Sequence, residues 1–424
     1  MARIYPHESP KALFDNWIVL MNFDVLIIGG GVIGLTAALE IRRRRPEISI
    51  MVAEAEKTLA KHGSGRNSGV LHSGIYYPQA SLKAAMCAQG AKAMREYCCA
   101  RSLPLRELGK ILVPTIENED SQLDLLALRA VQNGVEATML NKHELGDLEP
   151  EAHSVSGRAL HVPITSVCNP HQVMQALAND CKAVEVDLRL DWRACIFDSV
   201  NRTVTNQHRE RLGYGLLINA AGLYADKIAH AHGIAQSLHI LPFKGLYWKL
   251  DPASGIILNH LIYPVPDLRV PFLGVHTTTA TDGTVYLGPT AIPALGRENY
   301  SGLDGLRVDD VCQILRASVI QFVRNTNGFR RLSIVETSKL FKHQFANAAR
   351  KLLPRIEDHH LLPCDKVGMR AQLYDSISGQ LINDFVVEQT SDTVHVLNAI
   401  SPAWTCAFSF AKFLCDKYID KELL

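Results

Sequence analysis

The sequence lacks a surplus of charge of either sign. Its 424 residues include 44 Lys and Arg against 43 Asp and Glu, which leaves a formal net charge of +1. A chain with this balance creates no overall field that would attract nucleic acid or an anionic membrane. We therefore expect no nucleic-acid partner and no binding of other polyanions.

Long apolar runs and paired cysteines are also missing. No stretch approaches the roughly 18 to 20 consecutive apolar residues that a membrane span needs. The ten cysteines are scattered singly, and the only close pair, Cys98 and Cys99, is adjacent rather than spaced as Cys-x-x-Cys. This pattern indicates reduced thiols in a cytoplasmic compartment and no metal site.

The first 22 residues lack the features of a targeting peptide. Glu8 and Asp15 fall among them, and no basic segment leads into a long apolar core. We expect no cleaved leader, while a peripheral contact with an inner membrane through Trp17 to Met21 stays open. With 424 residues, the chain is longer than a single core usually supports, so two domains are expected.

Three short segments that begin at residue 23 predict a strand, a helix and a second strand. FDVLIIGG (23–30) is an apolar run ending in glycine, as in a parallel strand buried on both faces. VIGLTAALEIRRRR (32–45) has helical spacing and a basic last turn, and SIMVAEAE (49–56) is a second apolar strand that ends in acids. Together they form a βαβ unit of the size that binds a mononucleotide.

The same unit carries a glycine motif for a dinucleotide. Gly29, Gly31 and Gly34 have the G-x-G-x-x-G spacing, which allows a tight turn, a close backbone approach to a pyrophosphate and close packing of helix on strand. Glu54 follows 20 residues after Gly34, where an acid accepts hydrogen bonds from a ribose hydroxyl. That acid disfavours NADP, because it would repel the 2′-phosphate.

The stretch GSGRNSGVLHSGIYYP (63–78) favours FAD over NAD. It begins nine residues after Glu54 and mixes glycines with apolar and polar side chains, which suits a loop pressed against the extended half of FAD. A buried turn followed by a strand is the alternative interpretation. No second G-x-G-x-x-G motif follows to hold a nicotinamide dinucleotide. We expect electrons to leave the flavin for a quinone, another flavoprotein or oxygen.

This stretch resembles the flavin-contacting segment of the D-amino-acid-oxidase superfamily and, within it, that of the L-2-hydroxyglutarate dehydrogenases (oxidases). The resemblance covers nearly the whole chain from residue 23. Two departures stand out: Lys244 occurs where relatives commonly carry Arg, and Met369 where they have Val. The other segments similar to the family are LLINAAGLYAD (216–226), LPFKGLYWKL (241–250), NHLIYPVPDLRVPFLGVH (259–276), GMRAQL (368–373) and NAISPAWT (398–405).

The resemblance implies an α/β fold, with a Rossmann-like FAD-binding domain and a second, α+β substrate domain built on a mixed or antiparallel sheet. Between residues 241 and 300, short β-rich runs alternate with Pro and Gly turns, and residues 305–360 have helical spacing. The expected division is an N-terminal extension (1–22), a discontinuous FAD-binding domain (23–100, 165–240 and 362–424) and a substrate domain (101–164 and 241–361).

The motifs and the resemblance together give the expected FAD contacts. Ser401 and Pro402 precede an apolar periodic run, so we expect Ser401 as the N-cap and Pro402 as the first residue of a helix that faces the flavin. The full set is Gly29, Gly31, Val32, Ile33, Gly34, Glu54, Ala55, Arg66, Asn67, Ser68, Gly69, Val70, Ala221, Gly222, Ser401, Pro402 and Ala403.

The activity that the resemblance implies is FAD-dependent oxidation of L-2-hydroxyglutarate to 2-oxoglutarate, with the C2 hydride passing to flavin N5. His276, at the end of an apolar run, is expected to take the hydroxyl proton, and His72 in the flavin loop is the second candidate. We expect Arg370 to hold the substrate carboxylate bidentately, Tyr263 to donate to the substrate, and Lys244 to meet the distal carboxylate. The alternatives are a relative acting on glycerol 3-phosphate or an amine, and a flavin-binding protein without catalysis.

Overall fold

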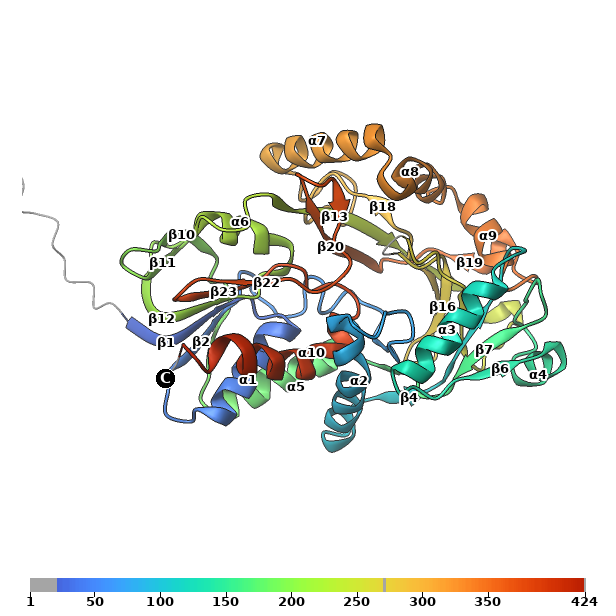
Figure 1. Cartoon of the computed structure of the whole chain (residues 1–424), viewed down its shortest axis with the longest axis horizontal. Helices are drawn as coiled ribbons and strands as arrows, with labels where there is room; N and C mark the ends of the chain where they lie inside the picture. The colour runs from blue at the N-terminus through green and yellow to red at the C-terminus, as the bar shows by residue number, and fades with distance from the viewer. Residues whose placement is uncertain (1–20, 270–271, 423–424) are drawn as a thin grey trace, which may run out of the picture.

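The computed structural model describes residues 21–269 and 272–422, which form two parts that face each other (Figure 1). Most of the expected N-terminal extension, including residues 17–20 of the expected membrane contact, lies outside the described residues. Met21 and Asn22 do not belong to an extension, because strand β1 (Met21–Ile28) begins at Met21.

The first part is built on an eight-stranded sheet whose strands come from three separate stretches of the chain. β1 pairs in parallel with β2 and with β12, and β23 pairs in parallel with the end of β12. The expected strand, helix and strand are confirmed as β1, α1 (Val32–Arg44) and β2. Besides β1, the strands are β2 (Ile50–Ala53), β9 (Asp187–Arg189), β10 (Ala194–Asp198), β11 (Thr203–Asn206), β12 (Arg211–Asn219), β22 (Val387–Gln389) and β23 (Thr393–Val396).

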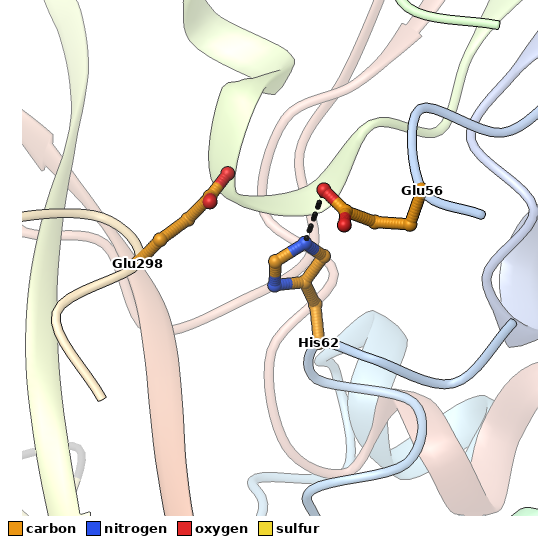
Figure 2. A group of neighbouring side chains, drawn as sticks. All are labelled: Glu56, His62 and Glu298. Carbon is orange, nitrogen blue, oxygen red and sulfur yellow. Dashed lines mark ion pairs between the residues drawn. The ribbon is translucent and has the colours of Figure 1, made fainter. Parts of the chain in front are cut away.

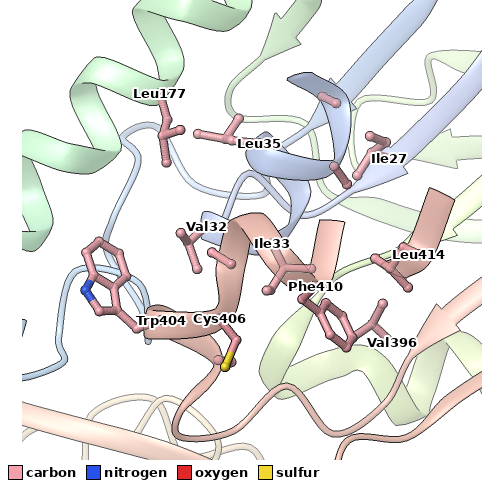
Figure 3. Packing of buried hydrophobic residues seen from close by; sticks show 14 of the residues in the cluster. Ile27, Val32, Ile33, Leu35, Leu177, Val396, Trp404, Cys406, Phe410 and Leu414 are labelled. Carbon is pink, nitrogen blue, oxygen red and sulfur yellow. The ribbon is translucent and has the colours of Figure 1, made fainter. Parts of the chain in front are cut away.

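Four helices cover one face of this sheet: α1, α2 (Leu82–Ala100), α5 (Pro170–Ala183) and α10 (Ala403–Leu414). Figure 3 shows Leu35 of α1 beside Leu177 of α5, and Phe410 of α10 beside Val396 of β23, in the shared core. The packing is close because glycines lie at two contacts. A Cβ on Gly34 would lie 2.0 Å from the carbonyl oxygen of Gly29, and one on Gly90 of α2 would lie 2.6 Å from that of Thr405. The helix α6 (Ala225–Ala231) packs against the other face.

The second part contains three four-stranded sheets that are mostly antiparallel, and only β15 and β5 pair in parallel among their described strands. The first contains β18 (Ile292–Pro293), β13 (Leu238–Leu246), β20 (Val367–Asp375) and β21 (Gln380–Leu381). The second contains β16 (His276–Thr279), β17 (Val285–Gly288), β14 (Trp248–Leu250) and β19 (Leu361–Leu362). The third contains β15 (Leu261–Pro264), β5 (Lys110–Val113), β7 (Ala159–Val162) and β6 (Thr138–Leu140). A small sheet of β3 (Val70–Leu71), β8 (Ser166–Cys168) and β4 (Leu105–Glu107) connects the parts.

The helices of the second part lie on its outer side. α7 (Val308–Arg324), α8 (Phe329–Ser338) and α9 (Lys342–Arg350) follow one another along one edge of the molecule (Figure 1), which confirms the helical segment expected over 305–360. The remaining helices are α3 (Asp120–Gln132) and α4 (Lys142–Leu148). Strand β20 pairs with β13 along its whole length, so a boundary at residue 362 would separate two paired strands. We propose instead that residues 367–381 belong to the second part.

A buried ion cluster joins the two parts. Arg297 and Asp226 of α6 are each 1% exposed, and Asp310 of α7 is 2% exposed. The guanidinium of Arg297 donates to both oxygens of Asp226, at 2.6 and 2.8 Å, and to Asp310 at 3.0 Å. Burial alone would raise the pKa of Asp226, but the hydrogen bonds and charge of Arg297 outweigh it and hold that pKa below the usual aspartate range. The cluster therefore links the helix that follows β12 with the outer helix α7.

Replacing Arg297 with Met should lower the free energy of unfolding by about 3 to 5 kcal/mol, because the buried carboxylate of Asp226 loses its cation, while Asp310 keeps its pair with Lys227 at 2.7 Å. Denaturant titration measures the loss. The pKa of Asp226 is lower in the folded protein than in the unfolded chain. The carboxylate therefore stabilises the fold at pH values above the ordinary aspartate pKa, and this stabilisation is lost as the pH falls from there through the folded pKa. The control is Arg158→Met, which breaks the half-exposed pair with Asp124 and should cost at most about 1 kcal/mol. Equal losses in the two variants would contradict the role of Arg297.

Candidate active site

A cavity of about 1030 Å³ lies between the two parts. Its volume is at the upper end of the range of about 300 to 1,000 Å³ that ligand pockets occupy, so it has room for more than a small acid. The first part contributes the β1–α1 turn, the loop after β2 and the start of α10. The second part contributes β13, β20 and the segment that leads into β16.

The β1–α1 turn forms one end of this cavity. Gly29 has φ +113°, and a Cβ there would lie 2.4 Å from the carbonyl oxygen of Ala220, so only glycine fits. Gly31 is the N-cap of α1 and lines the cavity, as do Val32 and Ile33. Gly34 does not line the cavity, because its role is the close contact with Gly29 described above.

Glu54, at the end of β2, shapes the same turn. Its Oε2 accepts a hydrogen bond from the backbone N–H of Gly30 at 2.9 Å, and its Oε1 accepts one from Glu56 at 2.9 Å. Burial raises the pKa of this carboxyl despite those two bonds. Glu54 and Ala55 both line the cavity, where a ribose would meet them.

The loop that follows is held in shape by its own polar side chains. The amide of Asn67 donates to the carbonyl of Ser64 at 2.8 Å, and its oxygen accepts from the N–H of Gly69 at 2.8 Å. Arg66 lies over the ring of Tyr300, 4.1 Å from its centroid. Gly69 does not line the cavity. It packs closely against β8 instead, because a Cβ atom at this position would lie 2.1 Å from the carbonyl oxygen of Cys168. The loop residues that line the cavity include Arg66, Asn67, Ser68 and Val70.

The segment before α10 closes the middle of the cavity. Ser401, Pro402 and Ala403 line it, as do Ala221 and Gly222 at the end of β12. The expected cap is displaced by one residue: α10 begins at Ala403, and Pro402 rather than Ser401 is the N-cap, without a side-chain hydrogen bond. Proline was expected inside the first turn, but its ψ of 36° at φ −100° leaves it outside the helix.

His276 reaches the cavity from the start of β16 and is 5% exposed. Its Nδ1 lies 2.8 Å from the carbonyl oxygen of Gly274. A carbonyl can only accept, so Nδ1 carries the hydrogen and Nε2 keeps a lone pair. The pKa of His276 is lowered to about 4, mainly by burial. The hydrogen bond to Gly274 raises this pKa, and the positive charge of Lys110 lowers it. The imidazole is therefore neutral and able to accept a proton at neutral pH.

His72 lies in the same cavity but is held differently. Its backbone N–H donates to Oγ1 of Thr405 at 3.0 Å, whereas its ring Nδ1 is buried without a hydrogen-bond partner among the described residues. Burial lowers the pKa of His72 to about 3, with smaller effects from Lys110, His276 and Arg370. No contact fixes which ring nitrogen of His72 carries the hydrogen.

Arg370 of β20 also lines the cavity, and its guanidinium has no hydrogen bond or ion pair within the described part of the chain. Its Cζ lies 5.0 Å from the centroid of Phe272. Burial lowers the pKa of Arg370 to about 10, which leaves it charged at neutral pH. An uncompensated guanidinium that is largely shielded from water needs an anion, and a bound carboxylate would supply it.

The structure does not bring Tyr263 and Lys244 into the cavity lining. Tyr263 is fully buried behind His276, and the two rings stack with centroids 4.0 Å apart. Lys244 lies between Phe243 and Gly245, which both line the cavity, so its side chain points to the opposite face of β13. There its ammonium donates to Asn299 at 2.7 Å. The distal-carboxylate role expected for Lys244 therefore lacks a geometric basis.

Two buried lysines near the site were not identified from the sequence. Lys83, in the first turn of α2, lines the cavity and is 3% exposed. Lys110 of β5 is fully buried behind the histidines, and its ammonium lies 4.5 Å from the ring centroid of Tyr76 and 5.5 Å from that of Tyr263. A lysine next to apolar residues gives no distinctive sequence pattern.

Glu56, His62 and Glu298 lie close together near the Glu54 end of the cavity (Figure 2). Their polar atoms already have partners in the protein. Glu56 pairs with Lys61 at 2.7 Å and with Arg193 at 2.9 Å, and Glu298 accepts from the hydroxyl of Tyr224 at 2.6 Å. We interpret the group as a polar network that joins the loop after β2 to the second part, because two cations already neutralise Glu56.

Comparisons with known proteins agree with this geometry. A family model described as FAD dependent oxidoreductase (DAO) matches residues 24–417. The L-2-hydroxyglutarate dehydrogenase of Indibacter alkaliphilus is 34% identical over 400 residues, which cover 93% of this chain and 98% of the relative. The enzyme of the same name from Escherichia coli K12 is 34% identical over 397 residues, 93% of each chain. The human mitochondrial enzyme is 32% identical, over 93% of this chain and 88% of its own.

Solved structures share the fold at lower identity. The L-alpha-glycerophosphate oxidase of Mycoplasma pneumoniae, with FAD bound, has a TM-score of 0.72 at 22% identity and covers 95% of both chains. The glycine oxidase of Geobacillus kaustophilus has a TM-score of 0.68 at 16% identity, again over 95% of both. The cavity fits FAD: it offers the glycine turn at one end and, at the start of α10, the buried Nε1–H of Trp404, which has no hydrogen-bond partner among the described residues.

Replacing Gly31 with Val should prevent FAD from binding to the cavity. A Cβ at this position would lie 3.0 Å from Oγ of Ser64, and the branched side chain would extend into the space beside the turn where the pyrophosphate binds. The FAD-to-protein ratio after purification, read from flavin absorbance, should fall by about tenfold or more. Gly146→Val is the control, since a Cβ there has nothing within 4 Å and lies far from the cavity lining. A fully yellow Gly31→Val protein would refute this position for the dinucleotide.

Proposed function

We infer, on the premise that this chain belongs to the DAO family of FAD-dependent oxidoreductases, that it oxidises L-2-hydroxyglutarate to 2-oxoglutarate. The observation that carries this inference is the full-length similarity to L-2-hydroxyglutarate dehydrogenases from bacteria and mammals. Arg370 and His276 support it, because they bring a carboxylate-binding group and a neutral base into one cavity.

Arg370 orients the substrate. Its guanidinium binds the carboxylate next to C2 in two parallel hydrogen bonds, which fixes the plane of that carboxylate and therefore the direction of the C2 hydrogen. The cation has no competing acid within ion-pair distance in the described chain. Lysine would supply the charge without the fixed plane.

His276 receives the hydroxyl proton at Nε2. The Gly274 carbonyl holds its Nδ1–H, and the stacked ring of Tyr263 keeps the imidazole plane in place. The negative charge of a bound substrate favours the imidazolium that forms, which offsets the depressed pKa of the free protein. FAD, when bound, supplies the acceptor for the hydride from C2. His72 remains the second candidate for the base.

The activity is tested by anaerobic reduction of the bound flavin. L-2-Hydroxyglutarate should bleach the yellow protein, whereas the D-enantiomer and glycerol 3-phosphate should not, because one fixed carboxylate and one fixed base present a single face of C2. His276→Ala should retain FAD and slow the bleaching by roughly 100-fold or more.

His72→Ala is the matched comparison, since this residue also lines the cavity and is the second candidate for the base. A larger loss in His72→Ala than in His276→Ala would transfer the role of base to His72. Efficient bleaching by glycerol 3-phosphate would favour the second candidate activity, which the fold shared with L-alpha-glycerophosphate oxidase suggests. A flavin that no such substrate bleaches would indicate binding without catalysis.

We also propose that the protein rests on an anionic membrane surface through α7 and α8. No helix within residues 21–269 and 272–422 is long and apolar enough to cross a bilayer. Yet these two outer helices and the turn after α8 carry eight exposed apolar residues, which we call the α7–α8 surface, with exposed fractions between 40% and 71%. Its residues are Leu315, Val319, Phe322, Val323, Ile334, Val335, Leu340 and Phe341.

Charge around the α7–α8 surface is one-sided. Four arginines on these helices are exposed, while Asp309 is the only exposed acid between residues 307 and 342. The arginines are Arg316, Arg324, Arg330 and Arg331. An apolar helix face bordered by basic residues is the pattern of helices that lie in the membrane interface. The net charge of the whole chain is near zero, so the composition does not reveal this local excess of positive charge. A bilayer contact favours a quinone as the electron acceptor over a soluble flavoprotein or oxygen.

The membrane contact can be measured by co-sedimentation with lipid vesicles. The protein should bind vesicles that contain phosphatidylglycerol, bind less to pure phosphatidylcholine, and release as salt rises. Val323→Asp should weaken binding by about tenfold, because it places a charge in the apolar face. Val200→Asp is the control, since Val200 is 93% exposed on the opposite part of the molecule. Equal binding of both variants would contradict the proposal.

A further inference from the structure

Lys83 is a buried cation without an acidic partner. It lies in the first turn of α2, is 3% exposed and lines the cavity. Its ammonium makes no hydrogen bond within 3.5 Å and no ion pair within 4.0 Å among the described residues. Two aromatic rings lie near the ammonium, with the centroid of Tyr77 at 5.4 Å and that of Phe385 at 5.7 Å. Such a charge is costly unless a ligand compensates it.

The one acid close by is already engaged. Asp384 accepts hydrogen bonds from the backbone N–H groups of Leu82 at 2.9 Å and Lys83 at 3.2 Å, and from its neighbour Phe385 at 2.9 Å. Its carboxylate therefore caps the start of α2 rather than neutralising the ammonium. Burial, and next the positive charge of Arg370, lower the pKa of Lys83 to about 7. The charge of Arg370 thus disfavours the charged form of Lys83, and a bound anion would favour it.

Two cations that line one cavity can bind a ligand with two negative groups. Arg370 and Lys83 come from different parts of the molecule, β20 and α2, and line the same cavity. L-2-Hydroxyglutarate carries two carboxylates, and Arg370 accounts for the one next to C2. Lys244 is turned away toward Asn299 and leaves the second carboxylate without the partner expected from the sequence.

We propose that Lys83 binds the distal carboxylate of the substrate and so selects dicarboxylates over monocarboxylates. This inference rests on the proposed oxidation of L-2-hydroxyglutarate. It assigns specificity to α2, a helix of the first part, whereas orientation at C2 comes from Arg370 and His276 of the second part. Lys83 touches the substrate but takes no part in proton transfer.

The test compares two substrates in Lys83→Met. L-2-Hydroxyvalerate has the same five-carbon chain as L-2-hydroxyglutarate but ends in a methyl group. The wild type should prefer the dicarboxylate in kcat/KM, and the variant should lose about 10- to 100-fold for it, mainly through KM. For L-2-hydroxyvalerate, kcat/KM should change by less than about threefold. FAD content should stay at the wild-type level.

A binding measurement accompanies the kinetics. Perturbation of the flavin spectrum gives the dissociation constants of the product 2-oxoglutarate and of 2-oxovalerate. Only the constant for 2-oxoglutarate should rise in Lys83→Met. Lys92→Met on the same helix is the control, because Lys92 is 73% exposed and should leave both constants unchanged.

The outcomes separate this inference from the function on which it rests. A wild-type protein that does not oxidise L-2-hydroxyglutarate overturns the proposed function. An active wild type whose Lys83→Met variant weakens both substrates equally, or neither, overturns only the role of Lys83. If Lys83→Met fails to fold, Lys83→Arg is the second test. Arginine keeps the positive charge on a longer side chain, so this variant should shift the preference from L-2-hydroxyglutarate toward L-malate, which is one carbon shorter. An unchanged ratio of malate to hydroxyglutarate in Lys83→Arg would also refute the inference.

Discussion

The active-site geometry depends on the buried guanidinium of Arg297. Binding groups come from both parts of the molecule, and their spacing holds only if the parts keep one relative position. Arg297 contributes to that constraint, because it bonds Asp226 on the helix after β12 and Asp310 on the outer helix α7. A buried charge network of this kind tolerates little displacement, since each lost bond leaves a charge without compensation.

The nucleotide end of the site was predictable from the sequence because its determinants are local. The strand, turn and helix around Gly29, Gly31 and Gly34 lie within one short segment, and Gly29 and Gly34 each meet a backbone atom that is close in the chain or follows an adjacent strand. Continuous apolar runs likewise predicted β1 and β2, and helical spacing predicted the outer helices. The family resemblance added Arg370 and His276, which do line the cavity.

The substrate end was harder because it depends on contacts between distant residues. The pairing of β20 with β13 joins segments more than a hundred residues apart, and the register of β13 decides that Lys244 faces away from the cavity. Lys83 enters the cavity only because α2 begins beside Asp384, a residue about three hundred positions later in the chain. The N-cap of α10 was misplaced by one residue, since sequence preference cannot show where the chain leaves the helix.

The cavity between the two parts also makes the stability of the folded enzyme depend on the supply of its cofactor. Its walls come from both parts, so a dinucleotide that fills it contacts surfaces that unfolding would separate. A ligand that binds only the folded chain stabilises it in proportion to the logarithm of its free concentration. The amount of folded enzyme in a cell should therefore follow the free FAD available, and a destabilised variant would be the most sensitive to a shortage of the cofactor.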